Sequence, residues 1–361
     1  MQQTQRFYAL DVLRGLAIAL MILVNTPGSW QHVYTPLLHA PWHGFTFADI
    51  VFPGFLFVVG AAMAFSLQQA PRNAATCWKI LKRTLLMFAC GLFLNWFWLL
   101  QWENLRIMGV LQRIALAYGI AALMVVLLPK RILLLSAIAL VAVYFALLQL
   151  GETPYELAGN AVRQFDLVIF GAEHLYQGFG VPFDPEGLLS TLPAVFNVLI
   201  GFWLADQLKT KTPQGGVRWL GMVGFVILLT ALVLSTFWPI NKALWTGSYA
   251  FLAAGLLIWL LALLVYLVDI KRATQLTEPL RVYGTNPLFI YMLSFVWSVT
   301  LSRLLSWQVD GEAISLTALI FSQLTTVLPH KIASLTFALS HVVLFWWVAK
   351  WLDNRRIYIK L

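Results

Sequence analysis

The chain has 361 residues, of which 60% are hydrophobic and only 11% carry a charged side chain. A soluble globular domain carries about 25% charged residues, so this composition excludes one and predicts an all-α, polytopic integral membrane protein. The formal net charge of +9 reflects membrane topology, as argued below, and does not indicate nucleic-acid binding. Cys77 and Cys90 lie at no metal-binding or redox spacing, so we expect reduced thiols.

Hydrophobic runs long enough to cross a bilayer, which needs about 20 apolar residues, predict a helical bundle of about ten transmembrane spans. Segment 314–328 is short for a span and is the candidate for an eleventh, or for a re-entrant or interfacial helix. We expect a single transmembrane domain over residues 1–361. The ten spans are expected at roughly 8–28, 48–68, 83–100, 107–128, 132–150, 188–206, 219–238, 247–268, 282–301 and 332–352.

The Lys and Arg residues favour ten spans over eleven. With ten spans and both termini in the cytoplasm, most of the 24 basic residues lie on the cytoplasmic side, in agreement with the positive-inside rule. The longest extracytoplasmic loop is then 151–187, which holds several acidic residues and a single basic one, Arg163. Its acidity either attracts a cationic substrate or is what the positive-inside rule leaves behind.

The first predicted span carries three polar residues on one side. Asp11 and Arg14 lie within one helical turn, and Asn25 returns to almost the same angle eleven residues after Arg14. A charge inside a span costs roughly 2.5–3.5 kcal/mol on insertion scales, so it is usually paired or functional. We expect the stripe to face the bundle interior or a polar cavity, with Asp11 and Arg14 as a mutual pair. Asn25 either donates to a substrate carbonyl or joins two helices.

The loop between the first two spans, HAPWHG, holds His39, Trp42 and His43. Imidazole titrates near neutrality, so His39 is a candidate general base or acyl acceptor, although a loop histidine is often merely solvated. Trp42 could stack on a sugar ring. Asp49 follows Thr46 at the spacing of a capping box, and it could also orient His39.

Three more residues are candidates for binding a substrate or cofactor. Arg113 lies in the predicted fourth span and needs an anionic partner, either a phosphate or a carboxylate such as that of Glu186. Glu186 opens the sixth span, where helix capping explains it equally well. Asn286 and Pro287 predict a broken or kinked ninth span whose free carbonyl groups could line a cavity. The His, Cys and carboxylate residues show no metal-ligand spacing, so we expect no metal.

Several strings resemble, in order, the transmembrane catalytic domain of the heparan-α-glucosaminide N-acetyltransferase family. The resemblance implies an acetyltransferase that uses acetyl-CoA as donor and a glucosamine-type amino sugar as acceptor. It also places the family's catalytic histidine at His39 and its active-site asparagine at Asn25. The strings are LDVLRG, HAPWHGFTFADIVFPGF, RIMGVLQRIALAY, FDPEGLLSTLPA, NKALWTGSY and YGTNPLFIY.

Resemblance and topology together predict a division of labour across a bacterial inner membrane. Coenzyme A would enter from the cytoplasm, past Asp11 and Arg14, and the acceptor would meet His39 at the periplasmic face. The expected partners are the lipid bilayer, acetyl-CoA and the amino sugar, and the sequence leaves a homodimer open. The alternatives are a secondary transporter for a sugar or anion, which ten spans and buried charges would suit, and an O-acyltransferase of a periplasmic glycan.

Overall fold

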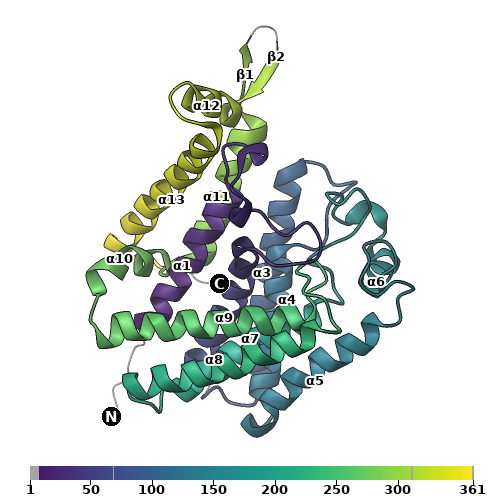
Figure 1. Ribbon diagram of the computed structural model, residues 1–361, viewed down its shortest axis with the longest axis vertical. Coiled ribbons are helices and arrows are strands. Elements are labelled where there is room, and N and C mark those ends of the chain that lie inside the picture. Colours follow the sequence, from purple (N-terminus) through teal and green to yellow (C-terminus); the bar gives the residue numbers. More distant parts are fainter. Residues whose placement is uncertain (1–7, 68, 310–311, 360–361) are drawn as a thin grey trace.

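The computed structural model describes residues 8–67, 69–309 and 312–359 as a helical bundle with one small hairpin (Figure 1). Within these residues, 10 helices are long and apolar enough to cross a membrane. This confirms the predicted all-α, multi-pass membrane protein and the number of spans. The predicted location of the two termini concerns residues 1–7 and 360–361, which lie outside the described residues.

The spans keep the predicted order with adjusted ends. They are Tyr8–Asn25 (α1), Phe47–Ser66 (the 3₁₀ turn η3, Phe47–Ile50, followed by α2, Val51–Ser66), Ala74–Leu99 (α3), Val110–Leu127 (α4), Lys130–Leu148 (α5), Thr191–Leu208 (α7), Pro213–Ser235 (α8), Gly247–Ile270 (α9, Gly247–Leu264, with the π-helical η5, Val265–Ile270), Pro287–Leu304 (α11, Pro287–Val299, with the π-helical η6, Thr300–Leu304) and His330–Asn354 (α13).

The remaining elements are short and lie between the spans. They are the helices α6 (Ala161–Phe170), α10 (Thr274–Tyr283) and α12 (Leu316–Thr325), the 3₁₀ turns η1 (Trp30–His32), η2 (Thr35–Leu37) and η4 (Ala172–His174), and the strands β1 (Ser306–Val309) and β2 (Glu312–Ser315). The strands pair antiparallel, with Ser306 opposite Ser315.

The structure decides between alternatives that the sequence left open at two places in the C-terminal third. The helix is broken rather than kinked before Asn286–Pro287, because α10 ends at Tyr283 and Pro287 begins α11. Proline suits a first helical turn, where its missing N–H leaves no bond unmade. Segment 314–328 contains only the 10-residue α12, which is too short to span. The hairpin β1–β2 precedes it and was not predicted.

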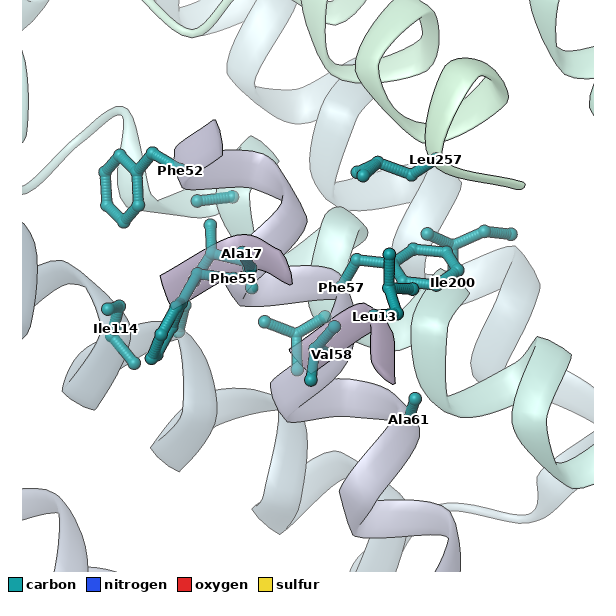
Figure 2. Packing of buried hydrophobic residues seen from close by; sticks show 14 of the residues in the cluster. Leu13, Ala17, Phe52, Phe55, Phe57, Val58, Ala61, Ile114, Ile200 and Leu257 are labelled. Carbon is teal, nitrogen blue, oxygen red and sulfur yellow. The ribbon is translucent and has the colours of Figure 1, made fainter. Parts of the chain in front are cut away.

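The hydrophobic core lies where α1, α2, α4, α7 and α9 meet. Figure 2 shows Leu13 and Ala17 of α1 among Phe55 and Phe57 of α2, with Ile200 of α7 beside them. Helices α2 and α7 approach closely because each carries a glycine at the contact. A Cβ at Gly60 would collide with the Val198 carbonyl, and one at Gly201 with the Phe57 carbonyl. Small residues permit such tight helix packing in membranes.

The connections after α1, α3, α5, α8 and η6 gather at one end of the bundle, which we call the His39 end. Cross-loop hydrogen bonds show this gathering: Gly44 N donates to Ile240 O at 2.8 Å and Ile107 N to His174 O at 3.1 Å. Contacts between helix ends also stabilise the opposite end of the bundle, for example the ion pair between Lys130 Nζ and Asp206 Oδ2 at 3.0 Å.

Candidate active site

His39 and Asp49 form a hydrogen-bonded pair at the His39 end. The His39 Nδ1 atom lies 2.8 Å from Asp49 Oδ1. The Asp49 side chain has 0% exposure, whereas 47% of the His39 side chain is exposed. A buried carboxylate accepts a hydrogen, so it fixes the tautomer with Nδ1 protonated and leaves the lone pair on Nε2. This arrangement suits a general base that meets its substrate from the open side.

The other carboxylate oxygen of Asp49, Oδ2, caps the N-terminus of the second span. Thr46 N donates to Oδ2 at 2.9 Å, Thr46 Oγ1 at 3.1 Å and Ala40 N at 3.3 Å. The predicted capping box is therefore confirmed. The two explanations of Asp49 left open by the sequence, capping and orienting His39, both hold, because each oxygen serves one of them.

Segment 240–249 holds the histidine loop from the side. Besides the bond from Gly44 N, Asn241 Nδ2 lies 3.3 Å from His43 Nδ1, and Tyr249 Oη donates to the Asp49 carbonyl at 2.8 Å. Asn241 and Tyr249 both have 0% exposure. Sequence reasoning noticed the string NKALWTGSY but assigned these two residues no part in the site.

Trp42 joins the histidine loop to the 151–187 loop. Its Nε1 donates to Tyr155 O at 2.7 Å, and its ring packs edge-on against Phe179 and Phe183, with centroids 5.9 and 5.4 Å away. These contacts give Trp42 an anchoring role. Its stacking on a sugar ring stays a prediction.

An ion cluster links the third and fifth connections. Arg106 binds Asp184 through two bonds of 2.8 and 2.7 Å, and Glu186 Oε2 through a third of 2.5 Å. These carboxylates raise the pKa of the Arg106 guanidinium above its usual value against the opposing effect of burial. Glu186 thus has Arg106 as its hydrogen-bonded partner. The prediction that it pairs with Arg113 is wrong, and its binding of a substrate stays a prediction.

Arg113 lies in the first turn of α4, because the helix begins at Val110 rather than at 107. It has 0% exposure. Its Nη2 donates to Gly187 O at 2.9 Å and to Ser190 Oγ, and its guanidinium lies 5.0 Å from the centre of the Trp245 ring. The Nε and Nη1 atoms have no hydrogen-bond partner among the described residues. Such donors are costly to bury unpaired, and they are suited to an anionic partner.

Lys242 is a further cation that sequence reasoning did not place in the site. It is partly buried in the segment that holds the histidine loop. Burial lowers the pKa of Lys242, while the charges of Glu186 and Asp49 oppose that shift. Its position in the loop, next to Asn241, therefore brings a positive charge towards the carboxylate that holds His39.

The 151–187 loop is less acidic at its surface than its composition implies. Asp166, Asp184 and Glu186 are all buried, and Arg106 forms ion pairs with the last two. Burial raises the pKa of the Asp166 carboxyl to about 7, opposed by a hydrogen bond from Leu188 N. Attraction of a cationic substrate by this loop would rest on its exposed glutamates alone.

The three polar residues of α1 do not come together around one site. Arg14 Nη1 lies 3.2 Å from Asp11 Oδ1, which confirms the predicted pair, and it donates to Gly284 O at 3.2 Å. Both lie near the N-terminal end of α1, whereas Asn25 is its last residue and is exposed. The part of Asp11 and Arg14 in donor binding, and of Asn25 in catalysis, stay predictions.

Asn286 anchors the C-terminal segment. It has 0% exposure, its Nδ2 donates to Ile357 O at 2.9 Å, and its Oδ1 accepts from Ile359 N at 2.7 Å. These bonds occupy the amide that was predicted to bind a substrate or cofactor. Among the described residues, no group of His, Cys, Asp and Glu has an arrangement that could hold a metal ion.

The fold and the site together define a multi-pass membrane protein with a histidine–carboxylate pair held by converging loops at one end. Comparison with known proteins gives the family. The family model described as "Heparan-alpha-glucosaminide N-acetyltransferase, catalytic" matches residues 6–224. The chain belongs to this family, and the match covers the histidine loop, Arg106, Arg113 and Glu186.

Two curated relatives extend the similarity beyond the family match. The heparan-alpha-glucosaminide N-acetyltransferases of Mus musculus and Homo sapiens are each 27% identical to the chain, over 352 and 350 residues. The alignments cover 80% of this chain and 53% and 52% of the relatives. The chain thus spans about half the length of the curated relatives it matches.

Proposed function

We propose that the protein is a membrane acetyltransferase that moves the acetyl group of acetyl-CoA to the amino group of a glucosamine-type sugar. The observation that carries the proposal is the 2.8 Å bond between His39 Nδ1 and the buried Asp49 carboxylate. It leaves Nε2 as a base on the open side of the loop. Membership of the family supports the acetyl donor and the amino-sugar acceptor.

The chemistry of the acceptor explains the need for this base. An amino sugar is largely protonated near neutral pH, and an ammonium group has no lone pair with which to attack a thioester. The ammonium group first loses one proton to water, which frees its lone pair. His39 Nε2 takes a second proton as the amine nitrogen bonds to the thioester carbonyl carbon, and Asp49 stabilises the imidazolium that results. When the carbon–sulfur bond breaks, the imidazolium returns a proton to the departing sulfur.

We place the His39 end on the periplasmic side of a bacterial inner membrane, with both termini in the cytoplasm. The distribution of basic residues supports this orientation, since Lys130, Lys209, Lys211 and Lys271 all lie at the opposite end. Coenzyme A would therefore approach from the end where α1 begins. Asp11 and Arg14 lie there, and we assign them to its entrance.

The test is acetyl transfer by purified protein in detergent or nanodiscs. With labelled acetyl-CoA, glucosamine should give an N-acetyl product, and His39→Ala should abolish it while labelled donor still binds. His43→Ala is the matched control in the same loop and should keep most of the activity. Product from glucose but not glucosamine would indicate an O-acyltransferase. Uptake of sugar into vesicles without any acetylated product would indicate a transporter.

A further inference from the structure

Helix α6 turns an apolar face away from the rest of the molecule. Phe165, Val168 and Ile169 are exposed by 40%, 84% and 52%, and their spacing of three and then one residue places them on the same side of the helix. The two charged residues of α6, Arg163 and Asp166, lie on the other side. A contiguous apolar face of this kind marks contact with another protein or with a membrane.

The opposite side of α6 is fixed to its own loop. Asp166 Oδ1 accepts a hydrogen bond from Leu188 N at 3.0 Å, and Arg163 Nε donates to Pro182 O at 2.9 Å. Pro182 and Leu188 flank the two carboxylates that bind Arg106. The apolar face is therefore held in a fixed direction by the same segment that carries the ion cluster.

Helix α6 begins at the level where the fifth span ends. The 19 residues of α5 make a helix about 28 Å long, close to the roughly 30 Å of a bilayer's hydrocarbon core. Gly151 follows the end of α5 by three residues, and a Cβ there would lie 2.6 Å from Ala161 N, at the start of α6. Figure 1 shows α6 at the outer edge of the molecule, beyond the end of α5. This position corresponds to the boundary between acyl chains and head groups.

The lipid-facing surface of α5 leads up to α6. Helix α5 exposes Leu135 and Val143 by 66% and 51%, as expected for a span that borders lipid. Leu150, exposed by 76%, lies seven residues after Val143 and therefore extends the same side to the end of the span. Helices α5 and α6 are in contact. The bilayer that covers α5 is thus the partner nearest to the apolar face of α6.

We propose that α6 is an interfacial helix that rests in the membrane surface at the His39 end and seats its loop there. Phe165, Val168 and Ile169 enter the outermost part of the acyl-chain region, and removal of their apolar surface from water stabilises the contact. Because the inserted side carries no cation, the contact needs no anionic lipid. The proposal is independent of acetyl transfer.

The test places a nitroxide spin label on the full chain in lipid nanodiscs that each hold one copy. Cys77→Ala and Cys90→Ala first remove the native thiols, and Val168→Cys then carries the label. In the membrane the label should collide often with oxygen, which dissolves in hydrocarbon, and rarely with a water-soluble nickel complex. Both accessibilities should therefore resemble those of a label at Val143→Cys, on the lipid-facing side of α5.

Glu156→Cys is the matched control, because Glu156 is an exposed residue of the same loop, and its label should meet the nickel complex freely. Nickel accessibility at Val168 equal to that at Glu156 would show that α6 faces water and would overturn the proposal. Low accessibility to both reagents would show that protein covers α6, which overturns it as well. Ile169→Cys repeats the measurement if Val168→Cys fails to fold. Phosphatidylcholine and phosphatidylglycerol nanodiscs should agree; insertion in phosphatidylglycerol alone would overturn the apolar basis of the contact.

Discussion

The substitution Asp49→Asn tests the histidine–carboxylate pair most sharply, because the geometry dictates how an asparagine must sit. The Oδ2 position faces three donors, namely Thr46 N, Thr46 Oγ1 and Ala40 N. An NH₂ group placed there would meet two backbone N–H groups, so the asparagine oxygen must take that position. Its Nδ2 then points at His39 Nδ1 and donates to it. This forces the proton of a neutral imidazole onto Nε2, where the lone pair is needed.

The expected loss is therefore in turnover and not in folding. Loss of general-base catalysis costs about 10²–10⁴-fold, and the same exchange lowers turnover about 10⁴-fold in the serine protease triad by the same tautomer effect. The capping bonds of Thr46 survive, so the melting temperature should change little. We expect acetyl transfer to fall by at least about 100-fold at saturating acetyl-CoA and amino sugar.

A second cap supplies the control. Asn73 caps α3 by accepting from Thr76 N at 2.9 Å, and Asn73→Ala should cost about 1 kcal/mol of stability with normal turnover. If Asp49→Asn keeps more than about a third of the activity, the tautomer argument is wrong. If it loses as much stability as Asn73→Ala and no more turnover, Asp49 is only a cap.

Four further outcomes are expected. Asn25→Ala should lower turnover roughly 10²–10³-fold if the amide is an oxyanion donor. The melting temperature should not change, because the side chain is exposed. Normal turnover would show that Asn25 is not part of the site. Arg106→Gln should lower the free energy of unfolding by about 3–5 kcal/mol, since it strands the buried carboxylate of Asp184; thermal melts would show it. Burial raises the folded-state pKa of Asp166 to about 7, above its unfolded value, so the folded carboxyl holds its proton more tightly. The free energy of unfolding of the wild type should therefore fall as pH rises from about 4 to 7. Asp166→Asn should remove that pH dependence, as measured by urea titrations. A cysteine at Glu156 should react with an impermeant maleimide in intact spheroplasts; labelling only after lysis would reverse the proposed orientation.

The sequence predicts the spans well because crossing a bilayer imposes a length and a composition on each helix. It also predicts the pairing of Asp11 with Arg14 and the cap at Asp49, since both depend on spacing within one helical turn. Its errors at the start of the third and ninth spans have local causes. Lys79, Lys82 and Arg83 continue α3 beyond the apolar run, and the helix break before Pro287 moves the start of the ninth span from 282 to 287.

Partners from different loops could not be predicted in the same way. Arg113 and Arg106 are seven residues apart, and the sequence analysis named only Arg113 as a partner of Glu186. Only the fold shows that Arg106, in the connection, reaches the carboxylate, while Arg113, in the helix, reaches Gly187 O and Ser190. Asn286 was misleading for a similar reason, because the backbone that it binds lies 71 residues away along the chain at Ile357.

The site is held together by side chains that bind backbone atoms of other loops. Tyr249 holds the carbonyl of Asp49, Trp42 holds that of Tyr155, and Arg113 holds that of Gly187. Each bond fixes a loop rather than a single side chain, and together they hold the Asp49 carboxylate where it binds His39. A base that is half exposed but aligned by a fully buried partner can admit a bulky acceptor without losing its orientation. That combination would let a histidine in a solvent-facing loop, rather than in the interior of a span, serve as the base that we propose.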